Sequence, residues 1–432
     1  MIPVHSSSGF ALPSILLLVV LLTAVAFLTI LQTHLERAIV LREVSNQKAD
    51  NASQSGIANA LASPNRTGTR EFKYQYSDGS SSNAKLVPWG SLIYVWSEGR
   101  HNTCVSTRGL LAAANPVGPF LNAIVLGNLS HQLIITGSSA IVGDVVTGLP
   151  GVGTGSLRDT PSPSRFPVNG SVSRVSASPI PHAIFPGLQT EISRFQRLTT
   201  EPGQLQISGN NEPLPDSIGI VRLRSEAISG LRVTRRSRPL IIVAEEGVVV
   251  RRGSEIKGLV ALISPDSIAI EEGCDIEGAI FYGASMIRIK GAASGQFFAP
   301  DIRVESGALV KYPSFLFSLD GISKEPRSIV VANGCKVEGT IAFIGQPKNN
   351  NELVVISEGA QVVGAIYSNA NVSLEGSVIG SVIAQDFYFY RAPTEYFGWI
   401  RNAHVDRRSL PKGFLVPPGF SDNAQLSVLQ WL

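Results

Sequence analysis

The most marked feature of the hydrophobic pattern is an uninterrupted apolar stretch near the start of the chain. From Phe10 to Leu31 no residue is charged. At 1.5 Å per residue a helix of this length spans roughly 33 Å, close to the thickness of the hydrocarbon core of a bilayer. A secretory signal has a shorter apolar run that ends at a small-x-small site, and no such site follows here. We therefore predict a retained transmembrane helix with boundaries at Phe10 and Leu31.

A second pattern, an alternation of apolar and polar positions, recurs in the C-terminal half. Its template is apolar-x-apolar-x-x-Gly-small-x-Ile/Val-x-Gly-x-apolar. Good copies are VVVRRGSEIKGLV from Val248, IAIEEGCDIEGAI from Ile268, IVVANGCKVEGTI from Ile329 and VVISEGAQVVGAI from Val354. Degenerate copies begin at Leu133, Ile287, Ile302 and Val372. From Val248 onward the starts are 20, 19, 15, 27, 25 and 18 residues apart, as expected for fixed strands joined by turns of variable length.

Each copy of the template predicts short strands that bury one face. A single strand cannot hide that face or satisfy its backbone groups, whereas stacked copies do both. We therefore predict a parallel β-helix, right-handed because crossovers between parallel strands are right-handed. The repeats resemble those of bactofilins and other polymer-forming β-helical proteins.

The rest of the chain divides by composition. Residues 71–148 alternate in polarity around Asp-Gly and Pro turns, which predicts a β-rich region containing the early repeat copy. Residues 149–215 are broken by Pro, Ser and Gly and are interpreted as an excursion or linker. Residues 216–386 hold the β-helix. Residues 387–432 abandon the template and begin with an aromatic cluster, which predicts a C-terminal cap.

The beginning of the chain resembles a type IV prepilin. A short polar leader, residues 1–9, ends in Gly9, and Phe10 opens the apolar helix. The segment 46–62, NQKADNASQSGIANALA, is similar to the second half of the long helix in minor pilins and tip pseudopilins, and residues 89–111 resemble the first strands of their heads. The resemblance implies one long helix over residues 10–62, cleavage after Gly9 and methylation of the new terminus at Phe10.

One position departs from the pattern of major pilins. Those proteins carry Glu at mature position 5, where it pairs with the methylated amine of a neighbouring subunit, and this chain has Ser14 there. Tip pseudopilins commonly lack that Glu. The resemblance therefore implies a subunit of low copy number at a tip or in an initiating complex. The Ala/Ser-rich segment after the membrane span is interpreted as a surface that another helix approaches closely.

Composition excludes some classes of function. The chain has 432 residues, of which 16% are charged, with 41 Gly and 26 Pro, and this balance favours a β-rich, turn-rich ectodomain. Its net charge of +3 is too small to indicate a nucleic-acid partner. Three cysteines cannot form a full disulfide framework. Cys274 and Cys335 occupy one template position and should point inward as small buried side chains, while Cys104 has no evident partner.

The repeats offer little that catalysis requires. Their aspartates fall at unmatched template positions, and no His occurs between His182 and His404. Glu277 and Glu338 match across copies but should face outward, where charge opposes edge pairing. No motif for a metal or a cofactor is present. We predict a protein that is not an enzyme and that has no cofactor, no metal site and no catalytic residues.

Three hypotheses of different classes remain. The first is a minor pilin or pseudopilin of a type IV pilus or a type II secretion-type assembly, with other prepilin-like subunits as partners. The second is a membrane-anchored adhesin that binds a surface glycan, and the third is a β-helical enzyme that degrades polysaccharides. In the first two we expect a single-pass protein of the inner (cytoplasmic) membrane, N-in and C-out, in contact with lipid. Its ectodomain would be periplasmic or on a surface pilus.

Overall fold

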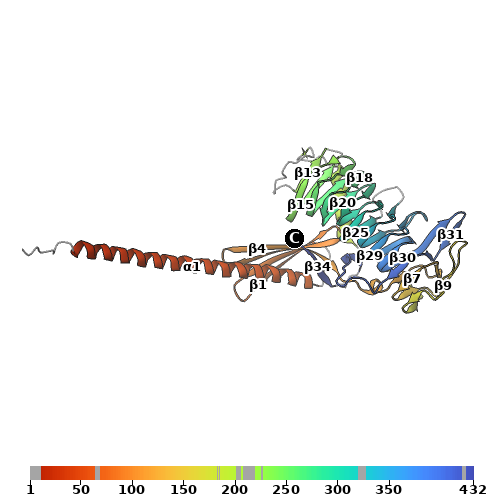
Figure 1. The fold of residues 1–432 in the computed structure, drawn as a ribbon, viewed down its shortest axis with the longest axis horizontal. Coiled ribbons are helices and arrows are strands. Elements are labelled where there is room, and N and C mark those ends of the chain that lie inside the picture. Colours follow the sequence, from red (N-terminus) through yellow and green to blue (C-terminus); the bar gives the residue numbers. More distant parts are fainter. Residues whose placement is uncertain are drawn as a thin grey trace, which may run out of the picture. The chain divides into compact units, whose positions relative to one another are not determined.

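The computed structural model describes residues 11–63, 69–181, 183, 185–200, 206–207, 219–224, 227–319, 327–420 and 425–432. The fold is mainly β, with one long apolar N-terminal helix and a large sheet of parallel strands, so the predicted fold class is confirmed (Figure 1). The chain divides into two compact units. The first comprises Met1–Asn59, Glu71–Ala84 and Ser97–Arg108, and the second comprises Ala60–Arg70, Lys85–Trp96 and Gly109–Leu432.

Helix α1 (Ala11–Ala62) is continuous over 52 residues. Pro13 lies in the first turn, where its missing N–H would have no partner within the helix. In and beside the apolar run, Thr23, Thr29 and Thr33 each donate a hydroxyl hydrogen to the carbonyl oxygen four residues earlier, at 2.5, 2.8 and 2.8 Å. These hydroxyls are satisfied within the helix, so their presence is compatible with a lipid environment.

A five-stranded sheet follows the helix, in the order β1-β2-β3-β4-β34. Its strands are β1 (Arg70–Gln75), β2 (Ser81–Trp89), β3 (Leu92–His101), β4 (Cys104–Ala114) and β34 (Leu426–Trp431). The first four are consecutive in the chain, and the last is antiparallel to β4, with Leu426 opposite Ala114. The intervening residues, including the whole repeat region, are therefore an insertion between two neighbouring strands of this sheet.

The repeat region is a stack of rungs with strands on three faces, each strand parallel to its equivalent in the next rung. The first face holds β14 (Ala227–Ile228), β16 (Val248–Val250), β18 (Ser267–Ile270), β21 (Met286–Ile289), β24 (Asp301–Val304), β26 (Ser328–Val331), β28 (Leu353–Ile356) and the end of β29 (Gln361–Leu374). The second face holds β19 (Asp275–Glu277), β22 (Ala292–Ala293) and the starts of β15 (Arg232–Ala244), β17 (Glu255–Ser264), β25 (Leu309–Leu319), β27 (Lys336–Ile344), β29 and β30 (Ser377–Arg391). The third face holds β12 (Gln206–Ile207), β13 (Ile220–Leu223), β20 (Ala279–Gly283), β23 (Gly295–Phe298) and the later parts of the long strands.

The register of the first face shows that the template copies are rungs, the degenerate ones included. One inward column runs through equivalent positions that are all 0% exposed, namely Ile268, Ile287, Ile302, Ile329, Val354 and Val372. The turn glycines of the template have positive φ, for example 78° at Gly273 and 73° at Gly334, a conformation that side chains disfavour. The hand of the coil stays a prediction.

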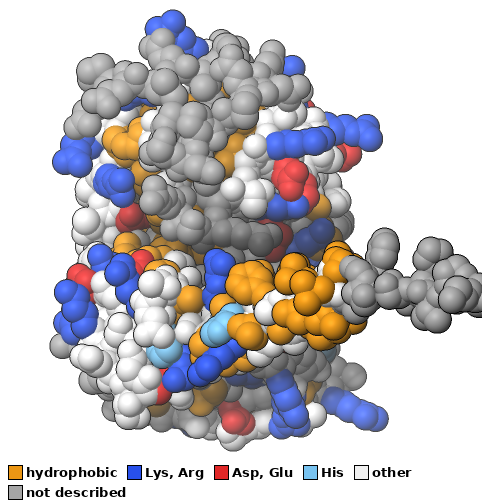
Figure 2. All heavy atoms as spheres, turned by 90° about the vertical axis from the view of Figure 1, so that its left-hand side faces the viewer, with side chains coloured by type: hydrophobic (Ala, Val, Ile, Leu, Met, Phe, Trp, Pro, Cys, Tyr) orange, Lys and Arg blue, Asp and Glu red, His pale blue; other side chains and the backbone are white. Residues whose placement is uncertain are grey.

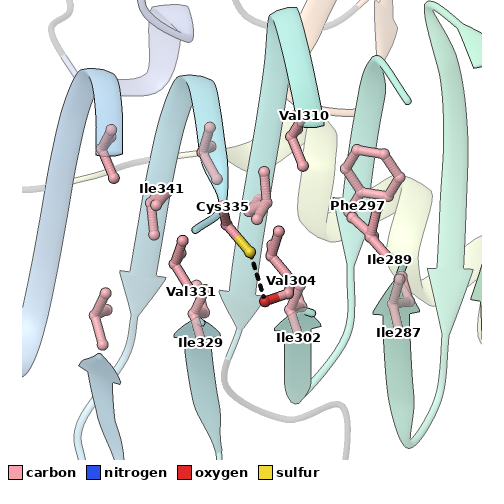
Figure 3. Close-up of a cluster of buried hydrophobic side chains, with 14 of the residues drawn as sticks. Ile287, Ile289, Phe297, Ile302, Val304, Val310, Ile329, Val331, Cys335 and Ile341 are labelled. Atoms are coloured by element: carbon pink, nitrogen blue, oxygen red, sulfur yellow. Dashed lines mark hydrogen bonds between the residues drawn. The ribbon is translucent and has the colours of Figure 1, made fainter. Parts of the chain in front are cut away.

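The template cysteines point into the stack, as predicted. Cys274 and Cys335 are free and buried, and Cys335 lies among the inward Val and Ile side chains of neighbouring rungs (Figure 3). The thiol of Cys335 donates to the carbonyl oxygens of Val304 and Glu305 at 3.4 and 2.8 Å. Both cysteines therefore act as small core residues. Cys104 is half-buried and is also free.

The stack does not end where the predicted cap begins, and this is a correction to the boundary at residue 386. The second-face part of β30 pairs with β33 (His404–Asp406), and its third-face part pairs with β5 (Ile124–Leu126). One rung is thus built from two segments far apart in the chain. The edges of β30 carry unpaired backbone groups that need a partner strand, and an earlier part of the chain supplies it.

Two further rungs come from residues before the repeat region. The first contains β6 (Leu133–Thr136), β7 (Ala140–Val142) and β8 (Val145–Thr147), and the second contains β9 (Val152–Thr154), β10 (Val168–Asn169) and β11 (Val172–Arg174). In the first of these rungs β6 pairs with β32 (Trp399–Arg401), β7 with β33 and β8 with β5, and the second rung pairs with the first. Figure 1 shows β7 and β9 beside β30 and β31 (Thr394–Phe397). The copy predicted at Leu133 is therefore a rung, and part of the expected excursion 149–215 belongs to the stack.

A second correction concerns the same segment, because it also contains helix α2 (Pro186–Thr200). Leu188, Ile192 and Phe195 are buried at helical spacing. They pack in a second hydrophobic cluster on the outer surface of the third face, separate from the cluster inside the stack. The same outer cluster includes residues of the short helices η1 (Gly118–Leu121) and η2 (Pro418–Phe420).

Candidate functional site: the exposed surface of helix α1

The N-terminal two thirds of helix α1 present an apolar surface that is exposed among the described residues. The large apolar side chains from Leu12 to Val44 are between 43% and 78% exposed. In Figure 2 hydrophobic side chains, in orange, gather on the part of the molecule that projects beside the grey tail, with basic and His side chains next to them. By length and composition α1 is the one described helix that could cross a membrane. Exposed apolar area of this extent requires lipid or another apolar surface.

The exposed apolar surface continues past the predicted end of the span at Leu31. Residues 32–48 would extend roughly 25 Å beyond the bilayer at 1.5 Å per residue. They mix charged side chains with exposed apolar ones, which are Leu35, Ile39, Val40, Leu41 and Val44. Leu35 and Ile39 are one helical turn apart and so lie on the same side of the helix. A simple membrane anchor has no need of apolar side chains at this height.

The last turns of the helix within the first unit pack on its sheet through small side chains. Ala49, Ala52 and Ser53 are at most 3% exposed. The hydroxyl of Ser53 donates to the carbonyl oxygen of Ser97 at 2.9 Å. A Cβ atom at Gly99 would lie 2.0 Å from the carbonyl oxygen of Ala49, so the helix backbone touches the strand directly. This corrects the interpretation that the small residues receive another helix, because this part of the segment packs against the protein's own strand.

An ion pair fixes the helix at the same height. Arg108 on β4 donates from Nε and Nη2 to the two carboxylate oxygens of Asp50, at 2.6 and 2.8 Å. The Ser106 hydroxyl donates to the same carboxylate at 3.0 Å. The hydrogen bond from Arg108 is the main reason why the pKa of Asp50 lies below its usual value, and it also raises the pKa of Arg108. The bidentate geometry sets both the rotation and the height of the helix on the sheet.

The predicted processing site lies outside the described residues, since Gly9 and Phe10 both precede the first described position. Cleavage and methylation therefore stay predictions. Ser14 and Leu31 both lie within α1 and are exposed. The described helix thus contains the predicted span from Ala11 to Leu31.

The structure brings together one titratable pair that the sequence did not indicate. His131, in the loop between β5 and β6, lies with Nδ1 2.5 Å from a carboxylate oxygen of Asp386, the β30 residue that pairs with Asn371 of the first face. Asn128 donates to the same oxygen at 2.9 Å. Burial raises the pKa of Asp386, although the bond with His131 acts in the opposite direction. The pair ties the two segments of the shared rung together.

The expectation that the repeats lack His holds only for residues between His182 and His404. The rungs built from residues 124–174 fall outside that range, and His131 lies among them. Glu277 and Glu338 do face outward: Glu277 accepts a hydrogen bond from Gln430 at 2.8 Å, and Glu338 pairs with Lys336 at 2.5 Å. Within the described ranges, no three His, Cys, Asp or Glu residues are grouped so as to hold a metal ion.

Comparisons with known proteins give likenesses to solved structures but not to known families. No known family matches the sequence, and no curated protein matches it. The crystal structure of the competence-associated pilin ComZ from Thermus thermophilus matches at 10% identity over 90% of this chain and 97% of that chain, with a TM-score of 0.23. A TM-score of this size does not establish a shared fold, so the function is argued below from the chain's own residues.

Proposed function

We propose that this chain is a non-enzymatic, minor-pilin-like subunit of a type IV pilus or a type II secretion-type assembly. Helix α1 would join the other prepilin-like subunits, and the chain would display the β-helix as its head. The observation that carries the proposal is the exposed apolar surface of α1, which continues from the predicted span through Val44. A bilayer covers only about 20 residues of it.

The residues beyond the bilayer argue for a protein partner. Fully burying one Leu, Ile or Val side chain stabilises an association by roughly 1.5–3 kcal/mol. Leu35, Ile39 and Val44 are 57%, 67% and 43% exposed, so covering them on another helix would contribute several such increments. The charged residues between them favour a mixed helix surface over hydrocarbon as the cover. In this proposal the helices of other prepilin-like subunits supply that surface.

The position of the subunit follows from Ser14. Because a hydroxyl carries no charge, this residue cannot form the carboxylate–amine pair that the resemblance implies for major pilins. We infer that the chain occupies a place where no such pair is needed, at the tip or in an initiating complex. Its copy number would then be low compared with that of a fibre subunit.

Co-purification with other prepilin-like subunits tests the proposal. The double substitution Leu35→Gln and Ile39→Gln removes two of the five exposed apolar side chains beyond the bilayer, the two that lie on one side of the helix, without touching the sheet-packed residues 49–57. We expect membrane insertion to be unchanged and the recovery of partner subunits to fall strongly. The matched control is Asn51→Ser, at an exposed polar position of the same helix. Partner recovery that survives the double substitution would contradict the proposal.

A helix exchange separates this proposal from the anchored adhesin. If an unrelated membrane helix replaces residues 10–48, the assembly proposal predicts loss of partner binding. An anchored adhesin would keep its function, because its helix serves only as a tether. Function that is retained after the exchange would replace the assembly proposal with the adhesin.

A further inference from the structure

A short hairpin interrupts the rung that two chain segments share. It consists of residues Tyr388–Phe397, the end of β30 and all of β31, and is here called the aromatic hairpin. At its base the backbone N–H of Gly398 donates to the carbonyl oxygen of Phe387 at 2.7 Å. Phe387 pairs with Val372 of the rung before it, and Ile400 pairs with Ile135 of the rung after it. The stack therefore continues across the base, and the hairpin is an addition to it.

The hairpin concentrates aromatic side chains on its two sides. On one side Phe389 stacks on Tyr396, with ring centroids 4.6 Å apart and 9° between the planes, and Trp399 meets Tyr396 edge-on at 5.4 Å. Arg401 lies over the Phe389 ring at 5.7 Å. Contacts of this kind stiffen a two-stranded hairpin that would be marginal alone. This layer supports the hairpin.

The other side is a strip in which rings alternate with polar groups. The His131 ring lies 5.8 Å from Phe397, and Phe397 lies 5.2 Å from Tyr388. The Tyr388 hydroxyl donates to Glu395 at 3.1 Å, and Glu395 is the cross-strand partner of Tyr390. Cross-strand partners project to the same side of a hairpin. The strip therefore runs from His131 at the rung to Tyr390 near the tip.

The strip is open to solvent at the groups that could meet a ligand. Tyr390 is 60% exposed, Glu395 is exposed, Phe397 is half-buried and the His131 side chain is 38% exposed. Since Asp386 engages Nδ1 of His131, any further hydrogen bond from this ring uses Nε2. A buried carboxylate thus holds the imidazole in one orientation at the edge of the aromatic strip.

The chemistry of the strip matches a sugar. A pyranose ring has an apolar face of C–H groups, which suits an aromatic face, and a rim of hydroxyls, which suits a carboxylate and an imidazole. The two arginines at the hairpin are each paired with a carboxylate, Arg391 with Asp159 and Arg401 with Glu375 at 2.8 Å, so neither is an uncompensated charge for a polyanion. A protein partner would need roughly 20–30 residues per side, more than this hairpin provides.

We propose that the strip formed by His131, Phe397, Glu395 and Tyr390 is a binding site for a neutral oligosaccharide. The sugar rings stack on Tyr390 and Phe397, and Glu395 and His131 accept or donate hydrogen bonds with the hydroxyls. The proposal is independent of the role of helix α1, so either one can fail without the other.

Calorimetric titration of the full chain in lipid nanodiscs tests the site. Nanodiscs are used because many detergents carry sugar headgroups that would compete with the probe. The probes are cellohexaose, chitohexaose and maltohexaose, with dextran sulfate as a polyanion. We expect at least one hexasaccharide to bind, and Tyr390→Ala to weaken its affinity about 10-fold or more, as loss of an exposed aromatic anchor does. Glu395→Gln should weaken it by a smaller factor.

The matched control is Phe166→Ala, because Phe166 is 61% exposed on the same unit but lies outside the strip. Its affinity for the sugar should stay within about twofold of the parent. The proposal is overturned if no neutral hexasaccharide binds, or if Tyr390→Ala and Phe166→Ala have equal effects. Binding to dextran sulfate alone would assign the surface to polyanions and would also overturn it.

Discussion

Replacing Gly99 by Ala should separate helix α1 from its sheet in the first unit. The added Cβ atom would lie 2.0 Å from the carbonyl oxygen of Ala49, 2.4 Å from the backbone nitrogen of Ser53 and 3.0 Å from the Ser53 Cα atom. All three are backbone atoms of the helix, so no side chain can rotate away. Ordinary contact begins at about 3.4 Å, and the helix must therefore move by more than about 1 Å.

That movement would also weaken the polar contacts at the same height. The Ser53–Ser97 hydrogen bond of 2.9 Å and the Asp50–Arg108 bond of 2.6 Å both depend on the present position of the helix. Overpacking a close contact costs typically 1–3 kcal/mol, and we expect about 3 kcal/mol here because only rigid backbone is involved. This cost corresponds to about a 100-fold rise in the population of the detached helix.

Hydrogen exchange measures the detachment. In the full chain in nanodiscs, peptides covering residues 49–59 and 97–108 should exchange about 100-fold faster in Gly99→Ala than in the parent, whereas peptides from the stack should not change. Gly219→Ala is the control, because no atom of the described residues lies within 4 Å of the Cβ atom it would add. If the two variants exchange alike over residues 49–59, the close approach of helix and strand is refuted.

Three further predictions concern charge, the order of the rungs and the thiols. Asp50→Asn should destabilise the first unit by about 1 kcal/mol near pH 7, since the pair is partly exposed. Because the folded state lowers the pKa of Asp50, the parent's advantage should begin to fall near pH 4, about the unfolded pKa, and should be lost as pH falls through the lower folded pKa. Ile276→Asp and Ile141→Asp should each lower the free energy of unfolding in urea by more than about 3 kcal/mol, and Glu277→Gln should lower it by less than about 0.5 kcal/mol. If residue 141 did not lie in a rung of the stack, Ile141→Asp would be tolerated. In the native chain, maleimide should label Cys104 alone within minutes, and labelling of the buried thiols before unfolding would contradict their placement.

The rungs could be predicted from the sequence because their signal is local. The alternation of apolar and polar residues and the turn glycine recur within 13 residues in each copy, so even the degenerate copy at Leu133 was recognised. The inward position of Cys335 follows from the same alternation. A pattern of this kind fixes which side of a strand faces the core, because side chains alternate with a period of two.

The order of the rungs could not be predicted in this way. Val382 pairs with Ile124, and the contact joins residues more than 250 positions apart without any local trace. The His131–Asp386 pair depends on this pairing and was missed for the same reason. The hairpin at 388–397 was noticed only as a cluster of aromatic residues, and its interpretation as a cap failed because earlier residues cover the end of the repeat region.

Helix α2 was missed for a different reason. Its apolar positions Leu188, Ile192 and Phe195 follow a helical spacing, but the surrounding segment is rich in Pro, Ser and Gly, which favours a linker. The helix is stabilised by packing on the outer surface of the third face, a tertiary contact that outweighs the local composition.

The mass of the mature N-terminus tests the central claim most directly. A prepilin-like subunit should be recovered from its own membrane as a chain that begins at Phe10 and carries a methylated amine, and Gly9→Val should block this processing. Peptide mass spectrometry of the membrane fraction distinguishes the two states. A chain that still begins at Met1 or Ile2, in the parent as in Gly9→Val, would contradict the assignment of this protein to a pilin-like assembly.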